Sequence, residues 1–154
     1  MAAYFCDASG IVKRYVRETG SAWVQALADP NAGNRLYLAR ITAVEVVAAV
    51  VRRQRGGTLS AAEMAAILLQ FRKDLAAGNR VVEITPALLT NAMNLAETHG
   101  LRAYDAVQLA AATELHASRM AGGLGSITLV SADQELNAAA LASGLIVEDP
   151  NFHP

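Results

Sequence analysis

An aspartate lies within a stretch of mostly apolar, helix-like sequence between Leu101 and Ala110. Apolar residues recur in this stretch at the three- and four-residue spacing of a helix, and a helix that is apolar on most sides is expected to be largely buried. A buried carboxylate must be paired, hydrogen-bonded or bound to a metal, because an isolated buried charge costs too much free energy. Arg102 is one partner within reach of Asp105, and the positive end of the helix dipole is another source of stabilisation.

Three more acidic residues occur close to the ends of predicted strands. Asp7 ends one short apolar run, Asp133 closely follows another, and Glu45 lies in the first turn of the helix that follows a third. In open α/β sheets, ligands bind in the crevice beyond the carboxyl ends of the strands. Asp105, near the start of an intervening helix, can face the same crevice. We therefore expect the four carboxylates to converge.

Converging carboxylates without matching cations repel one another and raise their own pKa values, and a divalent metal relieves this repulsion. A set of oxygen ligands favours Mg²⁺ or Mn²⁺ over zinc, which usually draws on Cys or His. The chain's histidines, at positions 99, 116 and 153, have no metal-site spacing. Hard metal ions held by carboxylates activate water and stabilise the charge that develops in phosphodiester cleavage.

Each acid also has a purely structural interpretation. Glu45 can complete a capping box with Thr42, and Asp7 can be a turn residue at a strand end. Asp133 can cap a helix or lie in its first turn, where the helix dipole stabilises a negative charge. For each acid considered alone, the structural interpretation is at least as well supported as a functional one. The joint placement of the acids at strand ends favours a site.

Short apolar runs alternate with helical segments along the chain, and the runs do not alternate polar and apolar residues. This pattern is typical of a parallel sheet covered on both faces, so we predict an α/β fold. Ser9 is expected to cap the first helix. Without repeats or linkers, residues 1–154 are expected to form one domain. The predicted strands are 3–6, 36–41, 80–84, 127–130 and 145–147, and the predicted helices are 10–17, 21–28, 42–55, 60–77, 85–99, 101–120 and 134–142.

Composition narrows the class of protein. Hydrophobic residues make up 53% of the chain, but no apolar run reaches the length of a membrane span. We see no signal peptide, and the one cysteine, Cys6, is expected to be a buried free thiol in a reducing compartment. The expected location is the cytoplasm, with no membrane association.

The charge balance argues against binding nucleic acid by bulk electrostatics, because the net charge is −1. Basic residues are nevertheless concentrated in the first third of the chain, where they form a local basic surface at most. Most of them are expected to lie on solvated helix faces. They are Lys13, Arg14, Arg17, Arg35, Arg40, Arg52, Arg53 and Arg55.

Four segments together resemble the PIN-domain family, and more narrowly its VapC-type toxins of toxin–antitoxin pairs. They come in the family's order, and the resemblance extends over essentially the full length. The segments are Asp7-Ala8-Ser9, Thr42-x-x-Glu45, Tyr104-Asp105-Ala106-Val107-Gln108-Leu109-Ala110 and Leu129-Val130-Ser131-Ala132-Asp133.

The resemblance implies a three-layer α/β/α fold with a mainly parallel central sheet and a Mg²⁺- or Mn²⁺-dependent endoribonuclease. Asp7, Glu45, Asp105 and Asp133 match the family's acidic positions, which bind metal and carry the catalysis. Three hydroxyl residues would support these acids: Ser131 matches the family's supporting Ser or Thr, and Ser9 and Thr42 are plausible donors. Candidate contacts to RNA phosphates are Arg14, Arg17 and Arg102.

The resemblance further implies a homodimer that a small antitoxin neutralises. The sequence has no second acid directly after Asp133, which leaves open whether the site holds one metal ion or two. A receiver-like or phosphatase-like domain is disfavoured, because Asp7-Ala8-Ser9 lacks the acidic pair or Asp-x-Asp motif of those folds. A catalytically weak PIN-like binding or scaffold protein remains the alternative.

Overall fold

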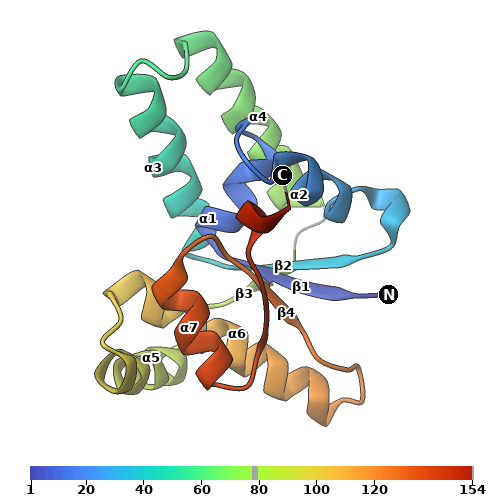
Figure 1. Cartoon of the computed structure of the whole chain (residues 1–154), viewed down its shortest axis with the longest axis vertical. Helices are drawn as coiled ribbons and strands as arrows, with labels where there is room; N and C mark the ends of the chain where they lie inside the picture. Colours follow the sequence, from blue (N-terminus) through green and yellow to red (C-terminus); the bar gives the residue numbers. More distant parts are fainter. Residues whose placement is uncertain (78–79, 154) are drawn as a thin grey trace.

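The computed structural model describes residues 1–77 and 80–153. A parallel sheet of five strands, in the order β3-β2-β1-β4-β5, forms its centre (Figure 1). The strands are β1 (Ala3–Cys6), β2 (Arg35–Ala39), β3 (Arg80–Val82), β4 (Thr128–Val130) and β5 (Ile146–Glu148). The α-helices are α1 (Ala8–Ile11), α2 (Ser21–Leu27), α3 (Thr42–Arg55), α4 (Ala61–Ala77), α5 (Pro86–His99), α6 (Ala103–Ala121) and α7 (Gln134–Ala142). Short 3₁₀ turns are η1 (Val12–Arg14), η2 (Pro30–Ala32) and η3 (Pro150–Phe152).

The predicted α/β fold with a parallel sheet is confirmed. All five predicted strands are present, β1 with the predicted ends and the other four with shifted ends. The first helix differs most from its prediction. It is a short α1 that continues into η1, and its N-cap is Asp7 rather than Ser9. The predicted end of the fourth helix at Gly78 and Asn79 lies outside the described residues.

Helices cover both faces of the sheet, which gives three layers. Successive strand residues point to opposite faces, so Phe5 packs with α5, α6 and α7, whereas Cys6 packs with α1, α3 and α4. Leu129 and Val130 divide between the two faces in the same way. Both faces of each central strand are therefore buried, which is why the strands are uniformly apolar.

The connections place β1 at the centre of the sheet. From β1 the chain passes to β2 and β3 on one side, and later returns to β4 and β5 on the other. The strand order therefore reverses direction between β1 and β4. The crevice beyond the carboxyl ends of such neighbouring strands is where ligands bind in this class of sheet.

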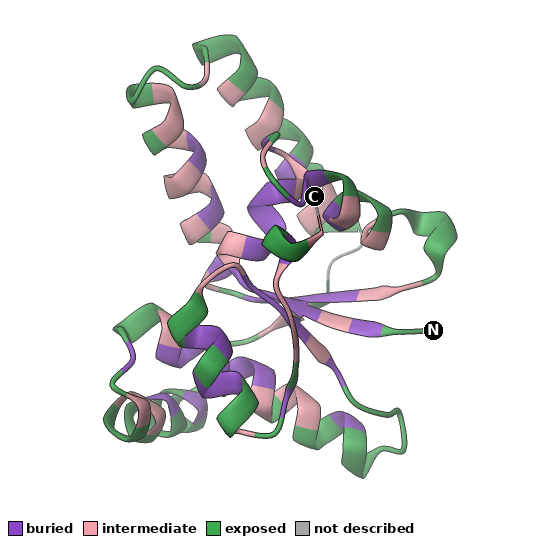
Figure 2. Ribbon diagram, viewed as in Figure 1, coloured by how far each residue is buried: buried purple, intermediate pink, exposed green. Residues whose placement is uncertain are grey.

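Helices α3 and α4 form a hairpin that projects away from the sheet, and its tip is exposed (Figures 1 and 2). The base of the hairpin is anchored by Val46 and Val50 on α3 and by Phe71 on α4, all of which are almost fully buried. The hairpin thus extends one wall of the crevice outward. No helix within the described ranges has the length and hydropathy needed to cross a membrane. Cys6 is a buried free thiol, as predicted.

Gly10 allows α1 to pack against the end of β4. A Cβ atom at this position would lie 2.4 Å from the carbonyl oxygen of Val130, far inside van der Waals contact. The contact is with backbone, which cannot rotate away as a flexible side chain can. Only glycine therefore permits this approach, which also brings Asp7, three residues earlier, next to β4.

Replacing Gly10 with alanine should destabilise the protein by about 1–3 kcal/mol or more, because α1 must move away from Val130. Urea denaturation followed by circular dichroism measures the change. Gly122→Ala is the matched control, since a Cβ there meets its nearest atom at an ordinary 3.4 Å. Equal stability of the two variants would contradict the packing role of Gly10.

Candidate active site

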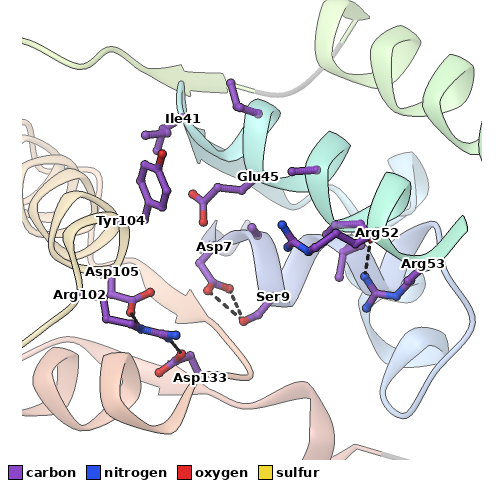
Figure 3. A pocket seen from close by; sticks show the side chains of 15 residues that line it. Asp7, Ser9, Ile41, Glu45, Arg52, Arg53, Arg102, Tyr104, Asp105 and Asp133 are labelled. Carbon is purple, nitrogen blue, oxygen red and sulfur yellow. Dashed lines mark hydrogen bonds and ion pairs between the residues drawn. The ribbon is translucent and has the colours of Figure 1, made fainter. Parts of the chain in front are cut away.

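A pocket of about 540 Å³ opens beyond the carboxyl ends of β1 and β4, and all four predicted acids line it (Figure 3). Asp7 comes from the end of β1, Glu45 from α3, Asp105 from α6 and Asp133 from the segment between β4 and α7. The four acids therefore line one crevice, as the sequence predicted.

Asp7 lies at the bottom of the pocket and is only 5% exposed. As the N-cap of α1, its Oδ1 accepts a hydrogen bond of 2.8 Å from the backbone N–H of Gly10. The hydroxyl of Ser9 donates to its carboxylate at 2.8–2.9 Å. Burial raises the pKa of Asp7 to about 7, and nearby Glu45 adds to the rise, while the bonds from Gly10 and Ser9 oppose it.

Hydroxyl groups connect the two strand ends that carry Asp7 and Asp133. The Ser9 hydroxyl accepts a hydrogen bond from the backbone N–H of Ala132 at 2.9 Å, and the Ser131 hydroxyl accepts one from that of Asp133 at 3.1 Å. The two hydroxyl oxygens are 3.4 Å apart. Ser9 and Ser131 therefore hold together the segments that carry Asp7 and Asp133.

Arg102 bridges the other two aspartates. Its Nε lies 2.8 Å from Asp105 Oδ2, and its Nη2 lies 2.6 Å from Asp133 Oδ2. Asp133 also caps α7 by accepting a hydrogen bond from the backbone N–H of Leu136, so its predicted capping role is confirmed. Burial raises the pKa of Asp105, the hydrogen bond from Arg102 opposes this rise, and the charge of Asp133 adds to it.

Glu45 is held by α6 and not by a cap. The N-cap of α3 is Ile41, which makes no side-chain capping bond, so the capping box of Thr42 and Glu45 is wrong. The Nε2 of Gln108 instead donates to Thr42 Oγ1 at 2.8 Å and to Glu45 Oε1 at 2.7 Å. Burial raises the pKa of Glu45, and the bond from Gln108 opposes that rise.

Gln108 was not singled out by sequence reasoning, although a signal was present. It lies three residues after Asp105 on the same helix and is 1% exposed, on a helix face that is otherwise apolar. A buried amide needs hydrogen-bond partners, which here are supplied by α3. Thr42, which was expected to be a donor to the acids, meets Glu45 only through this shared amide.

The arginines named as candidate phosphate contacts lie in different places. Arg102 lines the pocket, whereas Arg14 pairs with Asp74 at 3.1 Å and lines a separate depression. Arg17 is exposed and is not part of the pocket lining. Arg52 and Arg53, which the sequence had suggested were on solvated helix faces, line the end of the pocket formed by α3 (Figure 3).

The four acids share a pocket without forming a compact cluster. In the stretches 1–77 and 80–153, no three His, Cys, Asp or Glu side chains come close enough to hold a metal ion. Arg102 lies between Asp105 and Asp133 and offsets one of their two charges, while Asp7 and Glu45 rely on neutral hydrogen-bond donors. The pocket thus contains oxygen donors in excess of the cations bound to them, which is the donor chemistry that a hard divalent ion requires.

The chain is similar to known proteins in its sequence and in its fold. The family model described as "PIN domain" matches residues 4–141. Ribonuclease VapC45 of Mycobacterium tuberculosis (strain CDC 1551 / Oshkosh) is 32% identical over 154 residues, which cover 100% of both chains. PAE2754 of Pyrobaculum aerophilum has a TM-score of 0.61 at 23% identity, over 95% of this chain and 89% of that one. VapBC2 of Rickettsia felis, solved bound to a DNA fragment from its promoter, has a TM-score of 0.59 at 14% identity, over 96% and 98% of the two chains. The two structural likenesses establish the fold.

Replacing Asp7 with asparagine should stabilise the metal-free protein at pH 8 by a few kcal/mol. The folded-state pKa of Asp7 is raised from 3.8 to about 7, so the folded state binds more protons than the unfolded state between these values. Stability of the parent protein therefore falls as pH rises through this window, whereas asparagine keeps the capping bond without a charge. The advantage of the variant should shrink towards pH 4.

Thermal unfolding in EDTA at pH 4, 6 and 8 measures this difference. Asp29→Asn is the matched control, because Asp29 also caps a helical turn but is exposed. A stability difference between Asp7→Asn and the parent that does not change with pH would contradict the assignment.

Proposed function

The chain belongs to the PIN-domain family, and from this we propose that it is a metal-dependent endoribonuclease that acts as the toxin of a toxin–antitoxin pair. The observation that carries the proposal is the pocket that Asp7, Glu45, Asp105 and Asp133 line together. RNA as the substrate is supported by the full-length relative named as a ribonuclease. We further propose that residues 1–154 act as one domain.

The residues present suit a hard divalent cation. Asp7, Asp105 and Asp133 would hold it, and the excess of carboxylates in the pocket over the cations paired with them favours its entry. A bound Mg²⁺ or Mn²⁺ supplies a Lewis acid that activates water and neutralises the charge developing on a phosphodiester. For this ion to bind, Arg102 has to release Asp105 and Asp133, which it now holds at 2.8 and 2.6 Å.

The chain's own groups position the reaction. Glu45, with its pKa raised by burial, accepts a proton from the attacking water at Oε1 or Oε2. Gln108 fixes the orientation of this carboxylate through its bond to Oε1. Ser9, through its hydroxyl, keeps Asp7 directed into the pocket. Arg102, once released from the acids, is placed to contact a phosphate of the RNA.

The same proposal includes the partners. A small antitoxin would cover the pocket, and the protein would form a homodimer in the cytoplasm. The exposed apolar residues Val44 on α3 and Met93 on α5, which are 67% and 71% exposed, are available for such contacts. The buried free thiol of Cys6 is compatible with a reducing compartment.

The alternative is a PIN-like binding or scaffold protein with little activity. The bridge from Arg102 to two of the acids is the observation that favours it, because this bridge already satisfies half of the carboxylates. Metal-dependent cleavage separates the two functions.

Asp105→Asn should reduce RNA cleavage by about a hundredfold or more, because it removes a charged ligand from the proposed metal site. The measurement is cleavage of a defined RNA by purified protein, free of antitoxin, in EDTA, Mg²⁺ or Mn²⁺. Glu114→Gln is the matched control, since Glu114 is exposed on the same helix and does not line the pocket. Cleavage by Asp105→Asn at the parent rate would refute the site, and cleavage in EDTA would refute metal dependence.

Gln108→Leu should slow cleavage about 10–100-fold, the usual effect of removing a group that orients a catalytic carboxylate. It should also move the acid limb of the pH–rate profile to higher pH, because the bond from Gln108 holds the pKa of Glu45 down. A purely structural role would lower stability without moving this limb. Gln70→Leu is the control, because Gln70 is an exposed glutamine on α4 that bonds Asp74 outside the pocket.

A further inference from the structure

Arg52 lies on the same face of α3 as Glu45. The two residues are seven positions apart, which is about two helical turns and about 10 Å along the helix. Ala48 and Ala49 lie between them and line the pocket. Their small side chains leave the space between the carboxylate and the guanidinium open. In Figure 3 the Arg52 side chain points along the pocket towards Asp7 and Glu45.

The other arginines at or near the pocket are already held by carboxylates. Arg53, the neighbour of Arg52, pairs with Glu18 at 3.1 Å, and Arg102 is held by Asp105 and Asp133. Across residues 1–77 and 80–153, by contrast, no carboxylate lies within ion-pair distance of Arg52, and its side chain is exposed. Arg52 is therefore a pocket cation with its hydrogen-bonding capacity free.

A free guanidinium near four carboxylates can bind a phosphate of an RNA strand. The carboxylates repel the phosphates on either side of the bond to be cleaved, so the strand needs a cation at a distance from the acids. A guanidinium forms two parallel hydrogen bonds to a phosphate, which fixes both position and orientation. The basic residue must also reach into the groove, as Arg52 does and the exposed Arg55 at the end of α3 does not.

We propose that Arg52 is a phosphate-binding residue that positions the RNA strand along α3, with a flanking phosphate about two helical turns from Glu45. This inference rests on the proposed ribonuclease function. It adds that the RNA strand runs along α3, from the acids towards Arg52. Arg52 is a positioning residue, since it does not touch the reacting atoms. Ala8, Val12, Ala48 and Ala49 also line the pocket, and the intervening nucleotide would lie against these apolar side chains.

The experiment measures the binding of a fluorescein-labelled single-stranded RNA to the full chain carrying Asp105→Asn, which prevents cleavage. Anisotropy titrations in EDTA are repeated at several KCl concentrations. Adding Arg52→Gln should weaken binding about tenfold, the loss expected for one charged hydrogen-bonded contact. The slope of log K against log [KCl] should become shallower by about 0.7, because one phosphate contact is lost.

Two matched variants separate a local contact from a general loss of charge. Arg55→Gln removes the same charge from the same helix at an exposed position outside the pocket, and should change neither affinity nor slope appreciably. Arg52→Lys keeps the charge and loses the two-pronged geometry, so it should retain the salt slope with weaker binding. In the cleaving protein, Arg52→Gln should raise KM with little change in kcat.

The outcomes are distinct. Equal effects of Arg52→Gln and Arg55→Gln, or unchanged RNA binding by Arg52→Gln, overturn the inference while cleavage by the parent protein leaves the proposed function intact. Loss of binding to an acidic protein partner with unchanged RNA affinity would assign Arg52 to that partner and overturn the inference too. A parent protein that neither binds nor cleaves RNA overturns both.

Discussion

The burial of carboxylates in one pocket is the constraint on which the rest of the site depends, and their mutual repulsion adds to its cost. Asp7, Glu45, Asp105 and Asp133 come from four separate parts of the chain and are stabilised in three different ways. Asp7 is held by a helix N-terminus and a hydroxyl, Glu45 by an amide, and the other two by a shared guanidinium. Hydrogen bonds from neutral donors only partly offset burial, so the pKa values of Asp7 and Glu45 remain raised. A further positive charge in the pocket would therefore stabilise these carboxylates.

The sheet topology brings these groups together and permits little variation. Because β1 lies between β2 and β4, the segments after β1 and β4 are neighbours although they are more than a hundred residues apart in sequence. Ser9 and Ser131 join these segments by hydrogen bonds, and Gly10 lets α1 approach the end of β4. The same close approach that packs the core thus fixes the position of Asp7. Stability and site geometry have a common origin at this strand end.

Much of this arrangement follows from local sequence. Short apolar runs predicted the five strands, and the acids near their ends predicted the pocket, because parallel strands that end at one edge bring their following residues together. The predictions were wrong where the hydrogen-bond partner of a side chain comes from a distant part of the sequence. The cap of α1 is Asp7 and not Ser9, because the Ser9 hydroxyl instead donates to Asp7 and accepts from Ala132. The partner of Glu45 is Gln108, 63 residues away, which no local capping pattern contains.

The positions of the arginine side chains could not be predicted from local sequence either, and they give the two ends of the pocket different charges. A run of basic residues near the end of α3 has the appearance of a solvated face, yet Arg52 and Arg53 line the pocket while Arg55 does not. Helical spacing from Glu45 is what distinguishes Arg52, since a residue seven positions later returns to the same face. Arg102 pairs with two of the acids at one end, and at the other end no carboxylate among the described residues pairs with Arg52. Under the proposed function, a polyanion approaching along α3 would first meet the positive charge of Arg52, and a bound metal ion would neutralise the carboxylates at the centre of the pocket.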